Sequence, residues 1–250
     1  MADVLLAGYE ELVSRWRGLS ASSREAHVDD FVLNYAYNSG KIENDAITYH
    51  DTHEIFESGR IIAFTGDVRT LFEIQNLKTS WEWARPLAIP GLQLTEDLVL
   101  KAHELLTYGT YDEQRWNGGE RPGSYKLGDY VVGAKAVGAD AADVPELMRD
   151  LLDDVAAHLS DDRRVLTVAA YLHASLANIH PFADGNGRVA RLLMNMVFLA
   201  MNHPPVAIRE QDRMAYYGAL DAFHDEGDLE PFKCFLMTEC LITWENLLSS

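Results

Sequence analysis

Two predicted helices meet within the stretch LHASLANIHPFADGNGRVARLLMN, residues 172–195. The helix that leads into it has apolar residues at helical spacing. These are Val165, Val168, Ala169, Leu172, Leu176 and Ile179. The helix that leads out is apolar almost all round from Leu192 to Leu199, which is typical of a central core helix. The stretch therefore predicts two buried helices joined by a short polar turn.

The turn contains groups that suit an anion. Gly185, Asn186 and Gly187 let the backbone turn tightly and present bare N–H groups at the start of a helix, which makes an anion-binding nest. Arg188 and Arg191 are three residues apart and therefore lie on one face of that helix. Both can bind phosphate oxygens. These residues predict a phosphate cradle.

Two further side chains in the turn carry chemistry. Asp184 is a hard oxygen ligand that could hold a Mg²⁺ ion bridging the phosphates. His180, followed by Pro181, is the nearby group that can take a proton near neutral pH. A His-Pro pair or a Gly-Asn-Gly turn alone is usually structural. An ordinary turn between helices does not need the whole set, which indicates chemistry on a nucleotide phosphate.

The rest of the chain also reads as helices, so the predicted fold class is all-α with one small β feature. Residues 108–143 contain seven glycines and are predicted as loop, with Tyr130–Val132 as the best strand. The best domain boundary lies at Pro86–Gly91, which separates residues 1–90 from 91–250. The other helices are predicted over residues 4–16, 26–38, 48–57, 68–83, 96–106, 144–158, 209–226 and 230–248.

Composition limits the class of partner. The 250 residues include 21 Lys and Arg but 39 Asp and Glu, a formal net charge of −18. This argues against broad binding to nucleic acid or to an anionic membrane. The two cysteines, Cys234 and Cys240, have neither a disulfide nor a zinc spacing, and no apolar stretch is long enough to span a bilayer. We expect a soluble cytoplasmic protein.

The segment HPFADGNGRVAR, His180–Arg191, matches the pattern HPFx(D/E)GNGRxxR at every fixed position and resembles the Fic family. The resemblance implies a Fic-type helical bundle and transfer of AMP from ATP to a Ser, Thr or Tyr hydroxyl of a target protein. It implies that His180 is the general base and that Asp184 holds Mg²⁺. Gly185, Asn186 and Gly187 would then form the cradle, and Arg188 and Arg191 would bind phosphates.

Other segments extend the resemblance. YKLGDYVVGAK, Tyr125–Lys135, resembles the family's β-hairpin flap, on which the target protein docks. The resemblance places four flap residues at the nucleotide: Val132, Gly133, Ala134 and Lys135. Tyr216 and Tyr217 resemble a tyrosine pair near the adenosine, although a core stripe at helical spacing is an equal alternative.

The N-terminal half contains a second motif. SGKIEN, Ser39–Asn44, matches the inhibitory pattern (S/T)xxxE(G/N) and resembles the Fic class with an inhibitory helix before the core, here about residues 26–45. The resemblance implies that Glu43 pairs bidentately with Arg191 and blocks the γ-phosphate position, with Ser39 holding the Glu43 region. The alternative is a helix end with an exposed glutamate.

Several alternatives remain open. Kinase-like Doc relatives have Lys where this chain has Gly187, which favours AMP transfer here. An inhibitory glutamate could instead position water for de-AMPylation, or the chain could be a catalytically silent binding module. His50, Asp51 and His53 suggest a metal-dependent phosphohydrolase only weakly, because the further ligands cannot be placed. Self-modification and a homo-oligomer are open, and the sequence does not name the target.

Overall fold

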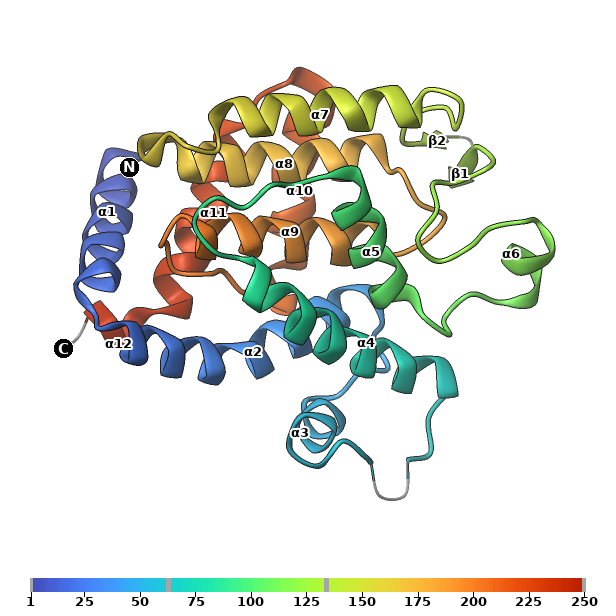
Figure 1. Ribbon diagram of the computed structural model, residues 1–250, viewed down its shortest axis with the longest axis horizontal. Helices are drawn as coiled ribbons and strands as arrows, with labels where there is room; N and C mark the ends of the chain where they lie inside the picture. The colour runs from blue at the N-terminus through green and yellow to red at the C-terminus, as the bar shows by residue number, and fades with distance from the viewer. Residues whose placement is uncertain (1, 62–63, 133–134, 249–250) are drawn as a thin grey trace.

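The computed structural model describes residues 2–61, 64–132 and 135–248, and nearly all of its regular structure is helical (Figure 1). The N-terminal helices are α1 (Ala2–Gly18), α2 (Ala21–Glu43), α3 (Tyr49–Ser58) and α4 (Val68–Ala84). The following elements are α5 (Glu96–Thr107), α6 (Glu113–Asn117), β1 (Tyr130–Val132), β2 (Lys135–Val137) and α7 (Val144–His158). The last helices are α8 (Val165–Ile179), α9 (Asn186–Ala200), α10 (Arg213–Glu226), α11 (Glu230–Thr243) and α12 (Glu245–Leu248). Short 3₁₀ turns occupy Arg85–Leu87, Asp162–Arg164 and Glu210–Asp212.

The core is built around α8 and α9, as their apolar sequences predict. The two helices pack along each other at the centre of the molecule, and α5, α7, α10 and α11 surround them (Figure 1). Nearly every residue of α9 is buried, which explains why its sequence is apolar on all sides. The turn between α8 and α9 lies at one end of this pair, next to the C-terminal part of α5.

The helix that carries the inhibitory motif begins earlier than predicted. α2 runs from Ala21 to Glu43, so it starts five residues before the predicted Ala26; it continues beyond the apolar stretch that ends at Asn38, and it ends within two residues of the predicted inhibitory helix of about 26–45. Ser20 begins it by accepting a hydrogen bond from the Ser23 N–H at 3.1 Å. The helix continues through Gly40. This glycine packs directly against Ile47 and Leu77, and a side chain there would collide with both. The motif therefore occupies the last turn of a helix.

The predicted loop over 108–143 contains more structure than expected. Asp112 caps the five-residue helix α6 by accepting from the Arg115 N–H at 2.8 Å, which sequence reasoning missed. β1 and β2 pair antiparallel, with Tyr130 opposite Val137 and Val132 opposite Lys135. A hairpin over the whole of 125–135 is not seen, because residues 125–129 form a loop. Gly133 and Ala134 lie outside the described residues, and a flap function stays a prediction.

The N-terminal helices pack on the rest of the chain. α1 packs on α11, and α2 lies against α4 and α9. Trp16, Phe31 and Trp244 join these helices in one aromatic cluster, with ring centroids 4.9 Å apart for Trp16–Trp244 and 5.6 Å for Phe31–Trp244. One hydrophobic core therefore includes residues from both sides of the predicted boundary at Pro86–Gly91. This packing brings α2 to the start of α9.

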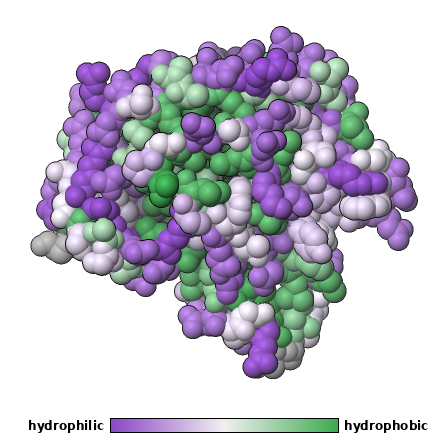
Figure 2. Space-filling view, viewed as in Figure 1, coloured by the Kyte–Doolittle hydropathy of each residue, from purple (hydrophilic) through white to green (hydrophobic). Residues whose placement is uncertain are grey.

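The surface is mostly hydrophilic, with apolar residues gathered toward the middle of the face shown in Figure 2. Residues 91–96, α7 and the C-terminal end of α9 form a cleft that contributes to this apolar area. Within the described residues, no helix is both long and apolar enough to cross a membrane.

Candidate active site

The backbone of the turn after α8 is unusual at His180. This residue has φ 50° and ψ 60°, a left-handed conformation that non-glycine residues seldom adopt. Its N–H donates to the Leu176 carbonyl at 2.9 Å and ends α8. The Lys126 N–H donates to the Pro181 carbonyl at 2.9 Å, which ties the segment before β1 to the turn. Several elements therefore hold His180 in a strained conformation, as is common at functional sites.

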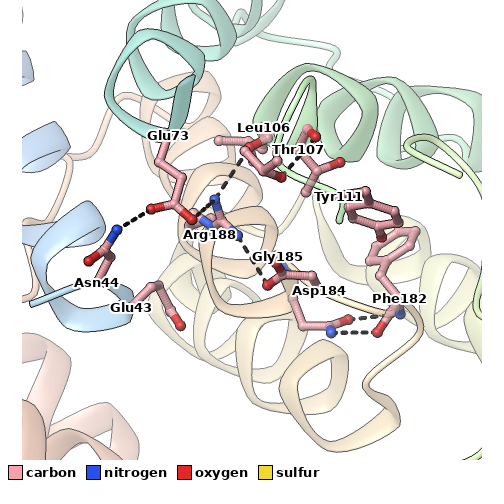
Figure 3. Close-up of polar contacts among 12 residues, drawn as sticks. Glu43, Asn44, Glu73, Leu106, Thr107, Tyr111, Phe182, Asp184, Gly185 and Arg188 are labelled. Atoms are coloured by element: carbon pink, nitrogen blue, oxygen red, sulfur yellow. Dashed lines mark hydrogen bonds and ion pairs between the residues drawn. The ribbon is translucent and has the colours of Figure 1, made fainter. Parts of the chain in front are cut away.

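Asn186 fixes the shape of the turn. Its Oδ1 accepts from the Phe182 N–H at 2.9 Å, and its Nδ2 donates to the Phe182 carbonyl at 2.8 Å, the paired contacts drawn at Phe182 in Figure 3. The same Nδ2 lies 3.1 Å from Nδ1 of His180. Gly185 has φ 82°, and a side chain there would press on Thr107, so a glycine is needed. The Asn186 side chain thus holds the turn and orients the His180 ring.

The imidazole of His180 is neutral at physiological pH. Burial lowers its pKa, and the nearby Lys126 ammonium lowers it further, to about 4. The carboxylates of Glu43 and Asp184 oppose this effect only in part. A neutral imidazole near pH 7 can accept a proton, so His180 meets the first requirement of a general base.

His103 on α5 supports the turn from the other side. Its ring stacks on Phe182 with the ring centroids 3.8 Å apart. Nδ1 accepts from the Gly123 N–H at 2.9 Å, so Nε2 carries the proton and donates to the Asp184 carbonyl at 3.1 Å. Burial lowers the pKa of His103 to about 3, which keeps it neutral. No motif contains His103, and the sequence analysis missed it.

The Asp184 carboxylate is ionised and surrounded by cations. Burial by itself would raise its pKa, but Arg188, Arg69 and Arg115 together lower it. The carboxylate lies at the N-terminal turn of α9, where an anionic ligand would also bind. Within the described residues no three His, Cys, Asp or Glu side chains cluster as a metal site. This donor set fits Mg²⁺ that is held jointly by one carboxylate and by nucleotide phosphates.

Arg188 is buried, and its guanidinium contacts other protein groups. Its NH2 group donates to Asp184 Oδ1 at 3.2 Å, and its NH1 lies 3.9 Å from Glu73 Oε1 on α4, as Figure 3 shows. Among the described residues, its Nε finds no hydrogen-bond partner. Arg188 was predicted to bind phosphate. In the structure its guanidinium holds Asp184 and Glu73, and phosphate binding by Arg188 stays a prediction.

Arg191 contacts the inhibitory motif. Its Nε donates to Ser39 Oγ at 2.9 Å, and its NH2 donates to the Ser39 carbonyl at 2.9 Å and to Glu43 Oε1 at 2.7 Å. The predicted pairing of Glu43 with Arg191 is therefore present, but through one nitrogen and one oxygen. The prediction of a bidentate pair is wrong, because Nε donates to Ser39 and NH1 donates to Tyr216. Ser39 binds Arg191 directly and not the Glu43 side chain.

The Glu43 carboxylate lies on Gly187 in the first turn of α9. A methyl group at position 187 would overlap Glu43 Oε1 and press on Arg191. Glycine at position 187 thus leaves room for the Glu43 carboxylate at the first turn of α9. The carboxylate, with about one third of its side chain exposed, occupies the helix N-terminus where phosphate oxygens would bind. The alternative, a freely exposed glutamate at a helix end, does not describe this contact.

The tyrosine pair divides into two environments. Tyr216 is buried, accepts from Arg191 at 3.4 Å and lies 3.1 Å from His173 Nε2, so it belongs to the core. Tyr217 remains 40% exposed. Its place near adenosine stays a prediction. Val132 and Lys135 pair their backbones between β1 and β2, and a role at the nucleotide stays a prediction for both.

Arg69 and Glu73, both on α4, also escaped the sequence analysis. Arg69 donates to Asp184, and Glu73 is 4% exposed. A glutamate on the buried face of a predicted helix was the available signal, since buried carboxylates are rare without partners. The helix α3 contains His50, Asp51 and His53, which form no metal cluster among the described residues. The two cysteines are free thiols.

Comparison with known proteins identifies the family. Residues 93–198 match the sequence model of the Fic/DOC family. Protein adenylyltransferase Fic from Drosophila willistoni is 30% identical over 202 residues, which is 81% of this chain and 39% of that protein. The protein of the same name from Drosophila persimilis is 30% identical over 217 residues, 87% of this chain and 41% of that one. The chain thus spans about two fifths of the length of these relatives.

Solved structures share the fold. Fic-1 from C. elegans aligns with a TM-score of 0.82 at 22% identity, over 99% of this chain and 72% of that one. A Fic domain-containing signalling protein from Bacteroides thetaiotaomicron aligns with a TM-score of 0.82 at 23% identity, over 97% of both chains. The helical architecture, the turn from His180 to Arg191 and the sequence matches agree, and residues 93–198 of this chain belong to the Fic/DOC family.

Proposed function

We propose that this protein transfers AMP from ATP to a Ser, Thr or Tyr hydroxyl of a target protein, and that its own α2 inhibits the transfer. One observation carries the proposal. A neutral, buried His180 and an ionised Asp184 lie in one turn, directly before a glycine-lined helix N-terminus. The curated relatives named protein adenylyltransferase Fic support the same reaction.

The residues divide the reaction between them. The hydroxyl oxygen attacks the α-phosphorus of ATP, and its proton passes to His180. The bond from the α-phosphorus to the oxygen that bridges to the β-phosphate then breaks, and pyrophosphate leaves. The N-terminus of α9 stabilises the phosphate charge. Asp184 would hold Mg²⁺, which when bound neutralises the phosphates.

Inhibition follows from the position of Glu43. Its carboxylate binds Arg191 and covers Gly187, so it excludes a phosphate from the same place. Arg191 is almost fully buried, and its guanidinium already donates to Ser39, Tyr216 and Glu43. ATP would then bind in a pose in which its α-phosphorus is not in line with the hydroxyl. Removing the carboxylate makes the guanidinium available to the γ-phosphate.

Further parts of the proposal concern partners. The target protein would add a strand to the β1–β2 segment, since an exposed strand edge can hold an extended peptide by backbone hydrogen bonds. Self-modification and assembly into a homo-oligomer are further proposals, as is a cytoplasmic location. De-AMPylation and phosphate transfer are outcomes of the test below.

The test compares ATP labelled at the α-phosphate with ATP labelled at the γ-phosphate, in cell extract. We expect weak α-label on protein with the wild type and about ten- to a hundredfold more with Glu43→Gly, because a charge-assisted contact of ~1.5–3 kcal/mol is lost. Glu43→Gln keeps the shape of the side chain and should activate less. The double variant Glu43→Gly/His180→Ala should lose the label.

Each of the other possible labelling results indicates a different function. Label from the γ-phosphate alone would show phosphate transfer in place of AMP transfer. Loss of AMP from a pre-labelled protein would show de-AMPylation. No label from either position, even with Glu43→Gly, would indicate that the protein is a binding module without transferase activity. Equal α-label with wild type and Glu43→Gly would refute inhibition by α2 and leave AMP transfer standing.

A further inference from the structure

Both carboxylate oxygens of Asp184 are already occupied by protein groups. Oδ1 accepts from the Gly185 N–H at 2.7 Å and from Arg188 at 3.2 Å. Oδ2 accepts from NH2 of Arg69 at 2.7 Å. Oδ2 accepts this one hydrogen bond and keeps a second lone pair, so a divalent cation bound there would lie beside the Arg69 guanidinium, and the two positive charges would compete for the carboxylate. Which donor leaves depends on how firmly each is held.

Arg188 and Gly185 cannot withdraw easily. Gly185 is the N-cap residue directly before α9, and its N–H is part of the turn itself. Arg188 lies one turn from Asp184, is 2% exposed, and also lies within 3.9 Å of Glu73. Moving its guanidinium would leave a charged group without partners inside the protein, which is costly.

Arg69 differs from these two residues in its place in the chain and in its exposure to solvent. It comes from a separate element, in the first turn of α4, and its side chain is 37% exposed. Its Nε donates to Glu73 Oε1 at 2.9 Å, so the guanidinium can lose Asp184 and keep a carboxylate partner. Glu73 in turn is fixed by Asn44, whose Nδ2 donates to Glu73 Oε2 at 2.6 Å (Figure 3). The Arg69 guanidinium thus connects the fixed carboxylate of Glu73 to the carboxylate of Asp184, from which it can withdraw.

We propose that Arg69 is a positioning residue that occupies the Asp184 carboxylate in the absence of a divalent cation and yields it to Mg²⁺ when nucleotide binds. Two cations cannot share one carboxylate oxygen without strong repulsion. Arg69 and the metal are therefore alternatives at Oδ2, and the free protein neutralises its metal ligand with its own guanidinium. The inference rests on the proposed function for its choice of metal and nucleotide.

The test measures how much Mg²⁺ strengthens ATP binding. The measured quantity is the ratio of the ATP dissociation constant in EDTA to that in excess Mg²⁺, from titration calorimetry. All variants carry His180→Ala, which stops transfer. If Arg69 competes with the metal, Arg69→Gln raises this ratio about three- to tenfold, the range for a charge-assisted contact at a partly exposed site. A purely structural Arg69 would change both dissociation constants equally and leave the ratio unchanged.

Arg115 provides the matched control. It also lowers the pKa of Asp184 through space, but its NH1 donates to Asp112 at 2.8 Å and its own contacts do not include Asp184. Arg115→Gln removes the same charge from the same surroundings, and the ratio should stay within about twofold of the parent. An equal rise with both variants would mean a general charge effect and overturn the proposal.

A double-mutant cycle closes the test. With Asp184→Asn in place, Arg69→Gln should no longer change the ratio, because the shared carboxylate is gone. A persisting rise would overturn the proposal. Arg69→Lys keeps the charge but cannot span two carboxylates, and an intermediate ratio is expected even if Arg69→Gln is unstable. None of these measurements needs transfer, so failure of the proposed reaction is detected separately, by the labelled-ATP test.

Discussion

At the scale of single residues, His180 combines a strained backbone with a buried neutral ring. The strain is maintained because Asn186, Lys126 and the end of α8 all hold the same short turn. Substitution by alanine removes the proton acceptor but none of the groups that we propose contact phosphate. We therefore expect the chemistry of the turn to be separable from nucleotide binding.

We expect His180→Ala to lower AMP transfer by ~10²–10⁴-fold, the usual contribution of a general base. ATP affinity should change little. The comparison is made in the Glu43→Gly background, with initial rates from α-labelled ATP and dissociation constants from calorimetry. Retained transfer would show that His180 is not the general base. A parallel loss of ATP affinity would give it a binding role.

The pH dependence of the same activity gives a second prediction for His180. Because its pKa is lowered to about 4, the ring stays a proton acceptor as pH falls from 7 to 5 and becomes protonated only near pH 4. The acid limb of kcat/KM for Glu43→Gly should therefore lie below pH 5. A limb near 6.5, the value of an exposed histidine, would contradict this environment.

At the scale of elements, the end of α2 determines where Glu43 points. Asn44 follows it, and its Nδ2 donates to Glu73 at 2.6 Å and to Thr70 Oγ1 at 3.1 Å, both on α4. Its N–H donates to the Gly40 carbonyl at 2.9 Å. The last turn of α2 is thus pinned to α4 on one side and to α9 through Arg191 on the other.

Asn44→Ala should release this end of α2 without removing the inhibitory carboxylate. We expect transfer to rise by about three- to tenfold, the effect of losing side-chain hydrogen bonds worth ~0.5–1.5 kcal/mol each, and to stay below Glu43→Gly. Thr48→Ala is the matched control, because Thr48 caps the adjacent α3 and makes no contact with Glu73. Equal rates for wild type and Asn44→Ala would mean that Arg191 and Ser39 alone hold Glu43.

At the scale of the whole molecule, buried neutral histidines link stability to pH. Burial lowers the pKa of His103 to about 3, below the value of about 6.5 expected in the unfolded chain. The unfolded state therefore binds the proton first as the solution is acidified. The stability due to a neutral His103 is complete above pH 6.5 and is lost progressively as pH falls toward 3.

From pH 7 to pH 5, this one group should lower the free energy of unfolding by about 2 kcal/mol. His103→Gln, which has no such proton, should lack that part of the pH dependence although it is less stable at pH 7. Urea denaturation of both proteins at the two pH values gives the difference. The same loss in both would show that His103 has the same pKa in the folded and unfolded protein.

Much of the fold was predictable because its signals are local. The bounds of α4, α5 and α7 agree with the predicted ranges within one residue, since capping residues and apolar spacing lie inside each segment. The start of α2 was predicted five residues too late, although Ser20 is a residue type that caps helices. Gly40, in the last turn of α2, packs against Ile47 and Leu77, which belong to other parts of the fold. Helix α6 was missed because five residues leave no periodic pattern.

The sequence by itself determined the turn between α8 and α9. Its groups lie within twelve residues, and Asn186 bonds Phe182 only four residues away, so spacing alone brings them together. Only the tertiary structure decided what surrounds the turn. The contact of Glu43 with Arg191, across 148 residues, was expected only from the family resemblance, and the contact of Arg69 with Asp184, across 115 residues, was not expected. The physical reason is that contacts between helices depend on how buried faces pack, and no local pattern of residues encodes which distant side chain a helix end will meet.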